Sequence, residues 1–371
     1  MHNSRIYELV KVFFLEGLTC FGGPSAHIAL MEKDTVEHRQ WLSHERFLDT
    51  FAASNLIPGP TSTQMAIHIG FIHAGTLGAI LAGTSFILPA FLITLGLAWL
   101  YVNIGNIPAF VHLSRGIEPA VLVIIIEAFW RFAKKNITNS QLVLIAIVIS
   151  LSVLSGLNQV LALFFGGLLG ILLLFKPKAN NTHPVLVVSI GNLAQPTLLK
   201  LGLFFLKIGS ILFGGGYLLF AFLQRELVIQ NHWLTQQELV DAIAVGQFTP
   251  GPILSTATFV GYLILGTPGA IISTLAIFLP SFILVLISNP LIPKMQQSKI
   301  TKAFLDGLKS ASIALIGLVA INLGYNILTV GQNFNWLTIF LVLLNSVLIF
   351  RLKVKSTWII ALGLLFGLLI D

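Results

Sequence analysis

Two copies of the tripeptide Pro-Gly-Pro, at 58–60 and 250–252, lie within apolar sequence, and each is followed by hydroxyl residues. Proline at the start of a helix, with Ser or Thr nearby, is typical of a helix N-terminus. Such an end presents unpaired N–H groups and a partial positive charge, which bind anions. We therefore expect each motif to start a half-helix, and two such ends could hold a tetrahedral oxyanion between them. The alternative is that each motif is only a tight turn at a membrane surface.

The residues expected to contact such an anion surround the two motifs. Asn55 and Gln247 each lie three residues before a motif and could add neutral donors. The full set is Asn55, Pro58, Gly59, Pro60, Thr61, Ser62 and Thr63 in the first half, and Gln247, Pro250, Gly251, Pro252, Ser255 and Thr256 in the second.

Two glycine motifs lie inside apolar runs of the sequence. They are Gly22-Gly23-Pro24 and Gly214-Gly215-Gly216. Small residues permit close helix packing, but they also permit an unwound break that lines a substrate site. Both interpretations stay open, and all six residues are candidate contacts.

Several charged residues lie in or near apolar segments. Lys207 is a candidate counter-charge for an anion, although a lysine near Lys200 could also extend to the interface. Glu16 could carry a coupling proton. Asp49 and Asp241, which precede the two Pro-Gly-Pro motifs at matching positions, could gate transport or bind protons, or could simply cap helices.

The sequence contains no pattern typical of an enzyme or an ATP-driven pump. We find no GxxxxGK[ST] phosphate loop, GxSxG or HExxH. His27, His68 and His73 have no Cys, Asp or Glu at ligand spacing, so we expect no metal site. We expect no catalytic residues and no cofactor.

The composition identifies the elements that must position these residues. Of the 371 residues, 56% are hydrophobic and only 9% are charged, against roughly 25% charged in soluble domains. The excess of 21 Lys and Arg over 14 Asp and Glu lies in short loops, as membrane topology requires. The fold class is therefore all-α polytopic membrane protein, and nucleic acid is not an expected partner.

The apolar runs define the expected spans. Simple runs occur near 8–30, 76–102, 108–132, 198–222, 267–289 and 303–323, while 141–175 and 336–370 are each broken by a polar turn. Segments 44–74 and 236–265 are amphipathic and interrupted at Pro-Gly-Pro. We expect these two to be broken or re-entrant helical hairpins, because freed backbone groups at membrane depth need protein or water as partners.

The chain repeats itself at a constant spacing of 192 residues, which relates Phe21 to Phe213, Trp41 to Trp233 and Asp49 to Asp241. Both Pro-Gly-Pro motifs fall in the same register, which low complexity alone does not explain. The predicted division is a first repeat over 1–176, a linker over 177–197 and a second repeat over 198–371.

Charge distribution indicates that the two repeats are inverted. Lysine and arginine concentrate in loops 31–46, 131–140, 291–302 and 351–355, whereas the matching loops of the other repeat hold one or none. Positive loops face the cytoplasm, so the charge changes sides between repeats. Each half then crosses an odd number of times, which gives about ten crossings plus the two hairpins, an arrangement characteristic of secondary transporters.

Taken together, these motifs resemble the chromate transporter (CHR, or chromate ion transporter) family, in its long-chain form with two tandem CHR domains. The resemblance rests on Phe21-Gly22-Gly23-Pro24, Trp41-Leu42 and Asn55 to Pro60, and on Phe213 to Gly216, Trp233-Leu234 and Gln247 to Pro252. The second half has Gly216 where the first has Pro24.

The resemblance implies a secondary transporter that exports chromate, with sulfate-like tetrahedral oxyanions as further substrates, across the plasma membrane on an ion gradient. Chromate resistance would follow. The expected partners are the oxyanion and the lipid bilayer, and a homodimer is one assembly such a chain could form. The alternative is an oxyanion channel or a membrane enzyme on an inverted-repeat scaffold.

Overall fold

Helices form most of the chain in the computed structural model, which describes residues 2–21, 24–104, 108–175, 195–213, 216–288, 295, 297–330 and 333–369. Strands β1 (Thr329–Val330) and β2 (Asn333–Phe334) form a small antiparallel hairpin between two helices. Four predicted contacts, Gly22, Gly23, Gly214 and Gly215, and most of the predicted linker lie outside the described residues.

The two halves have the same order of elements. The first contains α1 (His2–Thr19), α2 (Pro24–Glu32), π-helix η1 (Lys33–His38), α3 (His44–Ser54), α4 (Thr61–Ile104), α5 (Pro108–Asn136), α6 (Ser140–Leu154) and α7 (Gln159–Leu174). The second contains α8 (Leu198–Ile211), α9 (Leu218–Phe222), π-helix η2 (Leu223–Gln230), α10 (Gln236–Phe248), the 3₁₀ turn η3 (Ile253–Ser255), α11 (Thr256–Ser288), α13 (Lys299–Leu328), α14 (Trp336–Phe350) and α15 (Ser356–Leu369).

Helices α4 and α11 each contain a sharp bend at matching positions. Gly75 has φ 63° and ψ −153°, and Gly266 has φ 62° and ψ −155°. The backbones of Gly70 and Gly78, on the two sides of the first bend, are in direct contact, although eight residues of straight helix would separate them by about 12 Å. Each helix therefore consists of two arms, as the separate runs 44–74 and 76–102 predicted for the first half.

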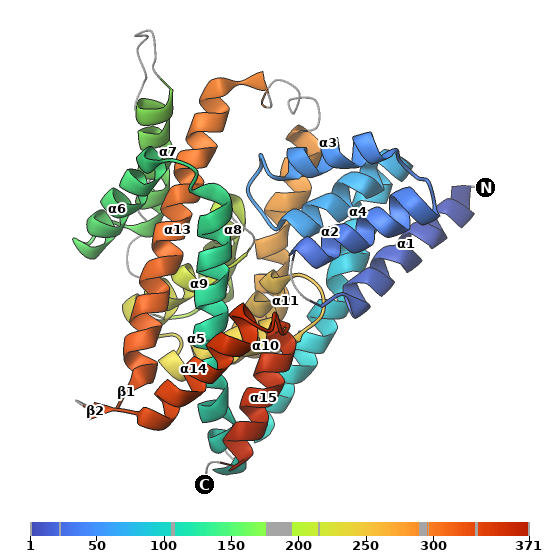
Figure 1. Ribbon diagram of the computed structural model, residues 1–371. Coiled ribbons are helices and arrows are strands. Elements are labelled where there is room, and N and C mark those ends of the chain that lie inside the picture. Colours follow the sequence, from blue (N-terminus) through green and yellow to red (C-terminus); the bar gives the residue numbers. More distant parts are fainter. Residues whose placement is uncertain are drawn as a thin grey trace.

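The halves pack on each other reciprocally. Helix α5 of the first half packs against α14 and α15 of the second, and α13 of the second packs against α6 and α7 of the first. Helices α4 and α11 also contact each other. In Figure 1, α6 and α7 lie toward the upper end of the view, and α14 and α15 toward the lower end. Because the last two helices of each half pack against a long helix of the other half, residues far apart in sequence come together.

The described helices are those of a multi-pass membrane protein. Three apolar helical segments, Thr61–Asn103, Ile253–Ser288 and Lys299–Leu328, are long enough to cross a bilayer, and four shorter apolar helices accompany them. The first two segments are bent, so each is divided into two arms, and in the first segment the two arms differ in length. The arm 61–73 extends only about 20 Å and the arm 76–104 about 43 Å, so only the longer arm matches a hydrocarbon core of about 30 Å.

The predicted runs 8–30 and 198–222 are not continuous helices. Helix α1 ends at Thr19 before α2 begins at Pro24, and α8 ends at Ile211 before α9 begins at Leu218. The described part of each break lies just before a glycine motif, at Cys20-Phe21 and Leu212-Phe213, and the role of the glycines themselves stays a prediction. The predicted interruptions of 141–175 and 336–370 are confirmed, because α6 and α7, and α14 and α15, are separate helices.

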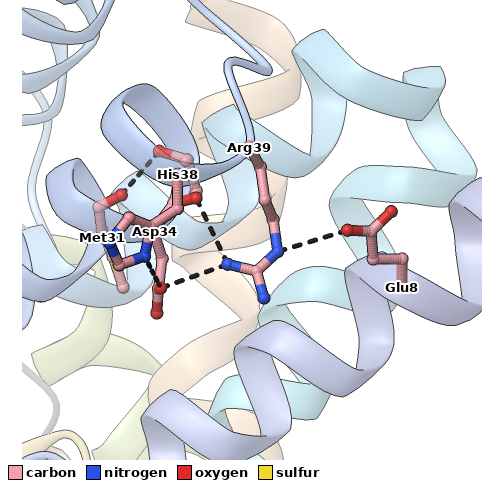
Figure 2. Close-up of polar contacts among 6 residues, drawn as sticks. Glu8, Met31, Asp34, His38 and Arg39 are labelled. Atoms are coloured by element: carbon pink, nitrogen blue, oxygen red, sulfur yellow. Dashed lines mark hydrogen bonds and ion pairs between the residues drawn. The ribbon is translucent and has the colours of Figure 1, made fainter.

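A polar network fixes η1 against α1 (Figure 2). Arg39 pairs with Glu8 through Nε (3.3 Å) and with Asp34 through Nη1 (3.1 Å), and His38 lies 3.4 Å from the same Asp34 oxygen. Thr35 donates to the Met31 carbonyl at 2.6 Å. These contacts hold the short elements after the first helix break in place beside α1.

Candidate functional site

The two Pro-Gly-Pro motifs lie where the halves meet. The Gly59 N–H donates to the Leu212 carbonyl at 2.7 Å, and the Gly251 N–H donates to the Cys20 carbonyl at 3.1 Å. Cys20 directly follows the last residue of α1, and Leu212 directly follows the last residue of α8. Each motif is thus bonded to the broken helix of the other half, by the same contact made twice.

A new helix begins after each motif, as predicted. Helix α4 starts at Thr61, and η3 followed by α11 starts at Ile253. The two glycine N–H groups, however, are occupied by protein carbonyls. Both bonds join the two halves, and the expectation that the helix starts after the motifs present N–H groups to an anion stays a prediction.

The larger of two cavities at this interface, here called the wide cavity, has a volume of about 550 Å³. It lies beside the first Pro-Gly-Pro motif and combines elements of both halves. Polar and charged residues line one part of it: Ser25, Glu32, Ser54, Asn55, Thr61, Arg131, Lys135, Asn136, Tyr217 and Lys309. Pro24, Ile57, Gly59 and Phe213 are also part of its wall. Arg131 and Lys135 are exposed, so the cavity opens to the outside of the protein.

The charge of the wide cavity is predominantly positive. Three cations line it against one carboxylate, Glu32, which also pairs with His44 at 2.8 Å. Lys309 lies 3.6 Å from Asp306, and Lys135 makes no ion pair with any described residue. Such a surface attracts anions and raises their local concentration.

A smaller cavity, here called the narrow cavity, lies beside the second Pro-Gly-Pro motif and has a volume of about 30 Å³. Its wall consists of Arg131, Tyr217, Gly246, Gln247, Thr249, Gly251, Ile253, Ser356 and Thr357. Ser356 and Thr357 are the first two residues of α15, so the N-terminus of that helix faces the cavity. Of the residues lining it, only Arg131 is charged.

Arg131 and Tyr217 belong to both cavities. Arg131 Nη2 donates to the Tyr217 hydroxyl at 3.0 Å, and Arg131 Nε lies 3.5 Å from Glu127. The guanidinium carbon is also 5.8 Å from the centre of the Tyr217 ring. The pair joins α5 of the first half to the chain just before α9 of the second, and both residues line both cavities.

The predicted polar contacts of the first motif divide between protein and cavity. Asn55 lines the wide cavity, but its Nδ2 donates to the Phe51 carbonyl at 2.8 Å. Gln64 Nε2 donates to the Pro58 carbonyl at 2.6 Å, and the Gln64 N–H donates to the Pro60 carbonyl at 3.0 Å. Thr61 lines the cavity. Ser62 and Thr63 are buried and line neither cavity, and Thr63 Oγ1 has no partner among the described residues.

The predicted contacts of the second motif are more buried. Gln247 and Gly251 line the narrow cavity. Pro250 and Pro252 are buried, and Thr256 donates to the Ile253 carbonyl at 2.8 Å. The buried Ser255 hydroxyl has no partner among the described residues. Gly216 has φ 92° and lies against Leu254, while its counterpart Pro24 lines the wide cavity.

Lys207 lies outside both cavities. Its Nζ pairs with the Glu226 carboxylate of η2 and lies 5.4 Å from the centre of the Phe204 ring. The structure thus supplies a protein partner for Lys207, and Arg131 is a cation that lines both cavities.

The three carboxylates expected in coupling or gating have different environments. Glu16 is only 2% exposed, and neither carboxylate oxygen has a partner among the described residues. Asp241 is buried and accepts from the Tyr101 hydroxyl at 2.9 Å and from Gln237 at 3.2 Å. Asp49, at the matching position, is exposed. Their roles in coupling stay predictions.

Sequence reasoning missed the contribution of α5, α13 and α15 to the cavities. Lys135 was noted only as part of the positive loop 131–140, and Tyr217, Lys309, Ser356 and Thr357 carried no signal. The one available signal was Arg131, a cation one turn after Glu127 at the end of an apolar run. Within the described residues, no group of His, Cys, Asp or Glu could hold a metal ion.

Comparison with known proteins agrees with the resemblance seen in the sequence. The chromate transporter family model matches residues 7–171 and again 199–368. The chromate transport protein of Cupriavidus metallidurans is 33% identical over 334 residues, covering 85% of this chain and 82% of its own length. That of Pseudomonas aeruginosa is 30% identical over 335 residues, covering 85% of this chain and 80% of its own.

A probable chromate transport protein of Synechococcus elongatus is 30% identical over 330 residues, which cover 85% of this chain and 84% of the relative. No solved structure matches the chain. The family model accounts for both halves of the sequence, and the relatives align over most of their length. The chain therefore belongs to the chromate transporter family.

Proposed function

We propose that the protein is a secondary transporter that exports chromate, and similar tetrahedral oxyanions such as sulfate, across the plasma membrane. Family membership supports the substrate class, because relatives that align over most of this chain are named chromate transport proteins. The observation that carries the proposal is the wide cavity. It lies at the first Pro-Gly-Pro motif and is lined by Arg131, Lys135 and Lys309.

The wide cavity suits an oxyanion that enters with part of its water shell. Its volume of about 550 Å³ lies within the range of roughly 300–1,000 Å³ common for small-ligand sites. Guanidinium and ammonium groups bind oxyanions by charge-assisted hydrogen bonds. Lys135 lies in the last turn of α5, in the positive segment 131–140 that we expect to face the cytoplasm, so the cavity would receive its substrate from that side.

Glu16 is the candidate for coupling to protons. A carboxylate that is 2% exposed and has no partner among the described residues is costly as an anion and much cheaper as a neutral acid. Its counterpart in the second half is Ile208, so only the first half would carry a proton here. Proton exchange at Glu16 would need a conformation that brings the side chain to water, which is also what alternating access requires.

Everted membrane vesicles test the proposal, since their cytoplasmic face is outside. Vesicles that contain the protein should accumulate chromate, and dissipating the pH gradient should reduce that uptake. Uptake equal to that of vesicles lacking the protein would refute the transport proposal. Uptake unaffected by the gradient, together with an oxyanion current, would identify a channel.

The coupling residue is tested in the same vesicles. Glu16→Gln keeps the size of the side chain but cannot exchange a proton, so transport should lose its response to the pH gradient. Glu37→Gln is the matched control, because Glu37 is exposed in η1. A Glu16→Gln variant that responds to the gradient as the wild type does would assign coupling elsewhere.

A further inference from the structure

The narrow cavity has the chemistry of a second anion site. Its lining contains one guanidinium, four hydroxyls and an amide, from Arg131, Tyr217, Thr249, Ser356, Thr357 and Gln247. No carboxylate among the described residues lines it. By the same measure that gives its volume of about 30 Å³, one water needs roughly 10–15 Å³, so the cavity has room for more than a single water.

The Tyr217 hydroxyl has two side-chain partners at this cavity. It accepts from Arg131 Nη2 at 3.0 Å and also bonds to the Gln247 side chain, whose buried Nε2 has no partner among the described residues. Tyr217 is only 8% exposed, which limits competition from bulk water. An anion beside this pair could therefore receive one hydrogen bond from the guanidinium, which has further donors, and one from Gln247 Nε2.

The opposite wall of the cavity is the beginning of α15. In α15 the Trp358 and Ile359 N–H groups bond to the Lys355 carbonyl, so the N–H groups left without a partner within the helix are those of Ser356 and Thr357. The dipole at this helix end favours negative charge. Ser356 and Thr357 add hydroxyls at the same place. Arg351, Lys353 and Lys355 immediately precede this helix start, so the surrounding charge is positive as well.

We propose that the narrow cavity is a second oxyanion site, and that the Arg131–Tyr217 pair is the partition between it and the wide cavity. The inference rests on the proposed function. An oxyanion in the wide cavity contacts Arg131 from one side, and one in the narrow cavity contacts Arg131 and Gln247 from the other. Movement between the sites needs only a rearrangement of the Arg131 and Tyr217 side chains, with Arg131 remaining a partner of the anion throughout.

The two sites differ in how much of its water shell the bound anion keeps. The wide cavity is open and contains Glu32, so it holds a hydrated anion weakly. The narrow cavity replaces water with donors on two sides, so it selects anions that have several acceptor oxygens around one centre. Chromate, sulfate and molybdate meet this requirement, whereas chloride offers no set of separate oxygens to bond to the two walls.

Chromate titration of the purified full-length protein in detergent tests the inference by calorimetry. The wild type should bind two chromate ions per chain, one more tightly than the other. Thr357→Val keeps the shape of the α15 wall, removes a hydroxyl and should weaken the tighter site about tenfold, while the weaker site is retained. Tyr217→Phe removes a hydroxyl that lines both cavities and should weaken both sites. Lys309→Gln should weaken only the site in the wide cavity. Tyr325→Phe, on an exposed residue of α13, should change neither.

Each outcome separates the two proposals. A wild type that binds a single chromate ion, or variants at Tyr217 and Thr357 that both retain full affinity, would overturn the second site even if vesicles transport chromate normally. Two sites that respond as expected, in a protein that transports no oxyanion, would refute the proposed function and leave the site standing. If Tyr217→Phe unfolds, Thr357→Val decides alone, because it alters only the first turn of α15.

Discussion

Arg131 is the residue on which most of the site chemistry converges. It lines both cavities, donates to Tyr217 and pairs with Glu127. A guanidinium can hold two protein partners and still present N–H groups to an oxyanion, because it has five donors in a planar arrangement. A lysine at this position would have a single ammonium and could not keep all of these contacts.

We therefore expect Arg131→Gln to raise the KM for chromate about tenfold to a hundredfold, the loss expected for a hydrogen bond to a charged group. Arg131→Lys should retain part of the affinity, since it keeps the charge but not the planar set of donors. Lys134→Gln, which removes an exposed cation of the same helix that lines neither cavity, is the control. Uptake kinetics in everted vesicles at matched protein amounts give the comparison, and an unchanged KM in Arg131→Gln would remove Arg131 from the oxyanion path.

Lys207 illustrates how a partner in the folded protein changes the role expected of a residue. Its ion pair with Glu226 is largely shielded, since the two side chains are 27% and 14% exposed. Removing one partner leaves the other charge in a poorly solvated position. The expected consequence is a loss of stability rather than a loss of substrate affinity.

Lys207→Ala should lower the free energy of unfolding by about 1–3 kcal/mol and leave the KM for chromate unchanged. The double variant Lys207→Met, Glu226→Gln should recover most of that stability, because no unpaired charge remains. Thermal unfolding in detergent measures both, and Lys200→Ala serves as the control on an exposed stretch of α8. A raised KM with normal stability would instead support the original expectation that Lys207 binds the oxyanion.

Among the elements, the bent helices α4 and α11 depend on glycine at one position each. Gly75 and Gly266 have φ near 62° and ψ near −155°, a region that is essentially confined to glycine. Space is not the constraint, since a Cβ at either position would meet nothing within 4 Å. The constraint is the backbone conformation itself.

Gly75→Ala and Gly266→Ala should each destabilise the protein by about 1–3 kcal/mol, and both should reduce transport because the short arms carry the helix starts after Pro-Gly-Pro. Gly96→Ala is a close control, because Gly96 is helical in the same α4 and a Cβ there also meets nothing within 4 Å. It should be neutral or slightly stabilising. Equal melting temperatures for Gly75→Ala and Gly96→Ala would show that the bend tolerates other residues.

The elements were predictable from the sequence where local chemistry determines them. Pro-Gly-Pro marks helix starts at Thr61 and Ile253, and the polar turn after Leu154 ends α6, because proline and exposed polar residues act within one turn. The cavities were not predictable in the same way. Arg131 meets Tyr217 only because α5 packs against elements of the second half, and a single sequence contains no direct measure of that contact.

On the scale of the whole molecule, reciprocal packing is the organising feature. The Gly59 N–H bonds to Leu212 in the other half and the Gly251 N–H bonds to Cys20 in the other half. The last two helices of each half also pack against a helix of the other half, α6 and α7 against α13, and α14 and α15 against α5. A contact that two units make with each other twice is expected for units related by a two-fold axis. The charges break this symmetry, because Arg131 corresponds to Asn322 and Glu16 to Ile208, so the two cavities differ in chemistry.

The inverted topology is the remaining prediction at this scale, and matching positions of the two repeats test it. Lys134 and Tyr325 are 191 residues apart, the spacing that relates Gly75 to Gly266, and both are exposed. If the repeats are inverted, Lys134→Cys should react with a membrane-impermeant maleimide only from the cytoplasmic face, and Tyr325→Cys only from the opposite face.

The background variant is Cys20→Ser, which removes the one native cysteine. Labelling in intact cells and in everted vesicles, with chromate uptake confirming that each variant is folded, gives four readings. The expected pattern is Tyr325→Cys labelled in cells and Lys134→Cys labelled in everted vesicles. Labelling of both positions from the same face would mean that the repeats are parallel, and that the alternation of positive loops along the chain has another cause.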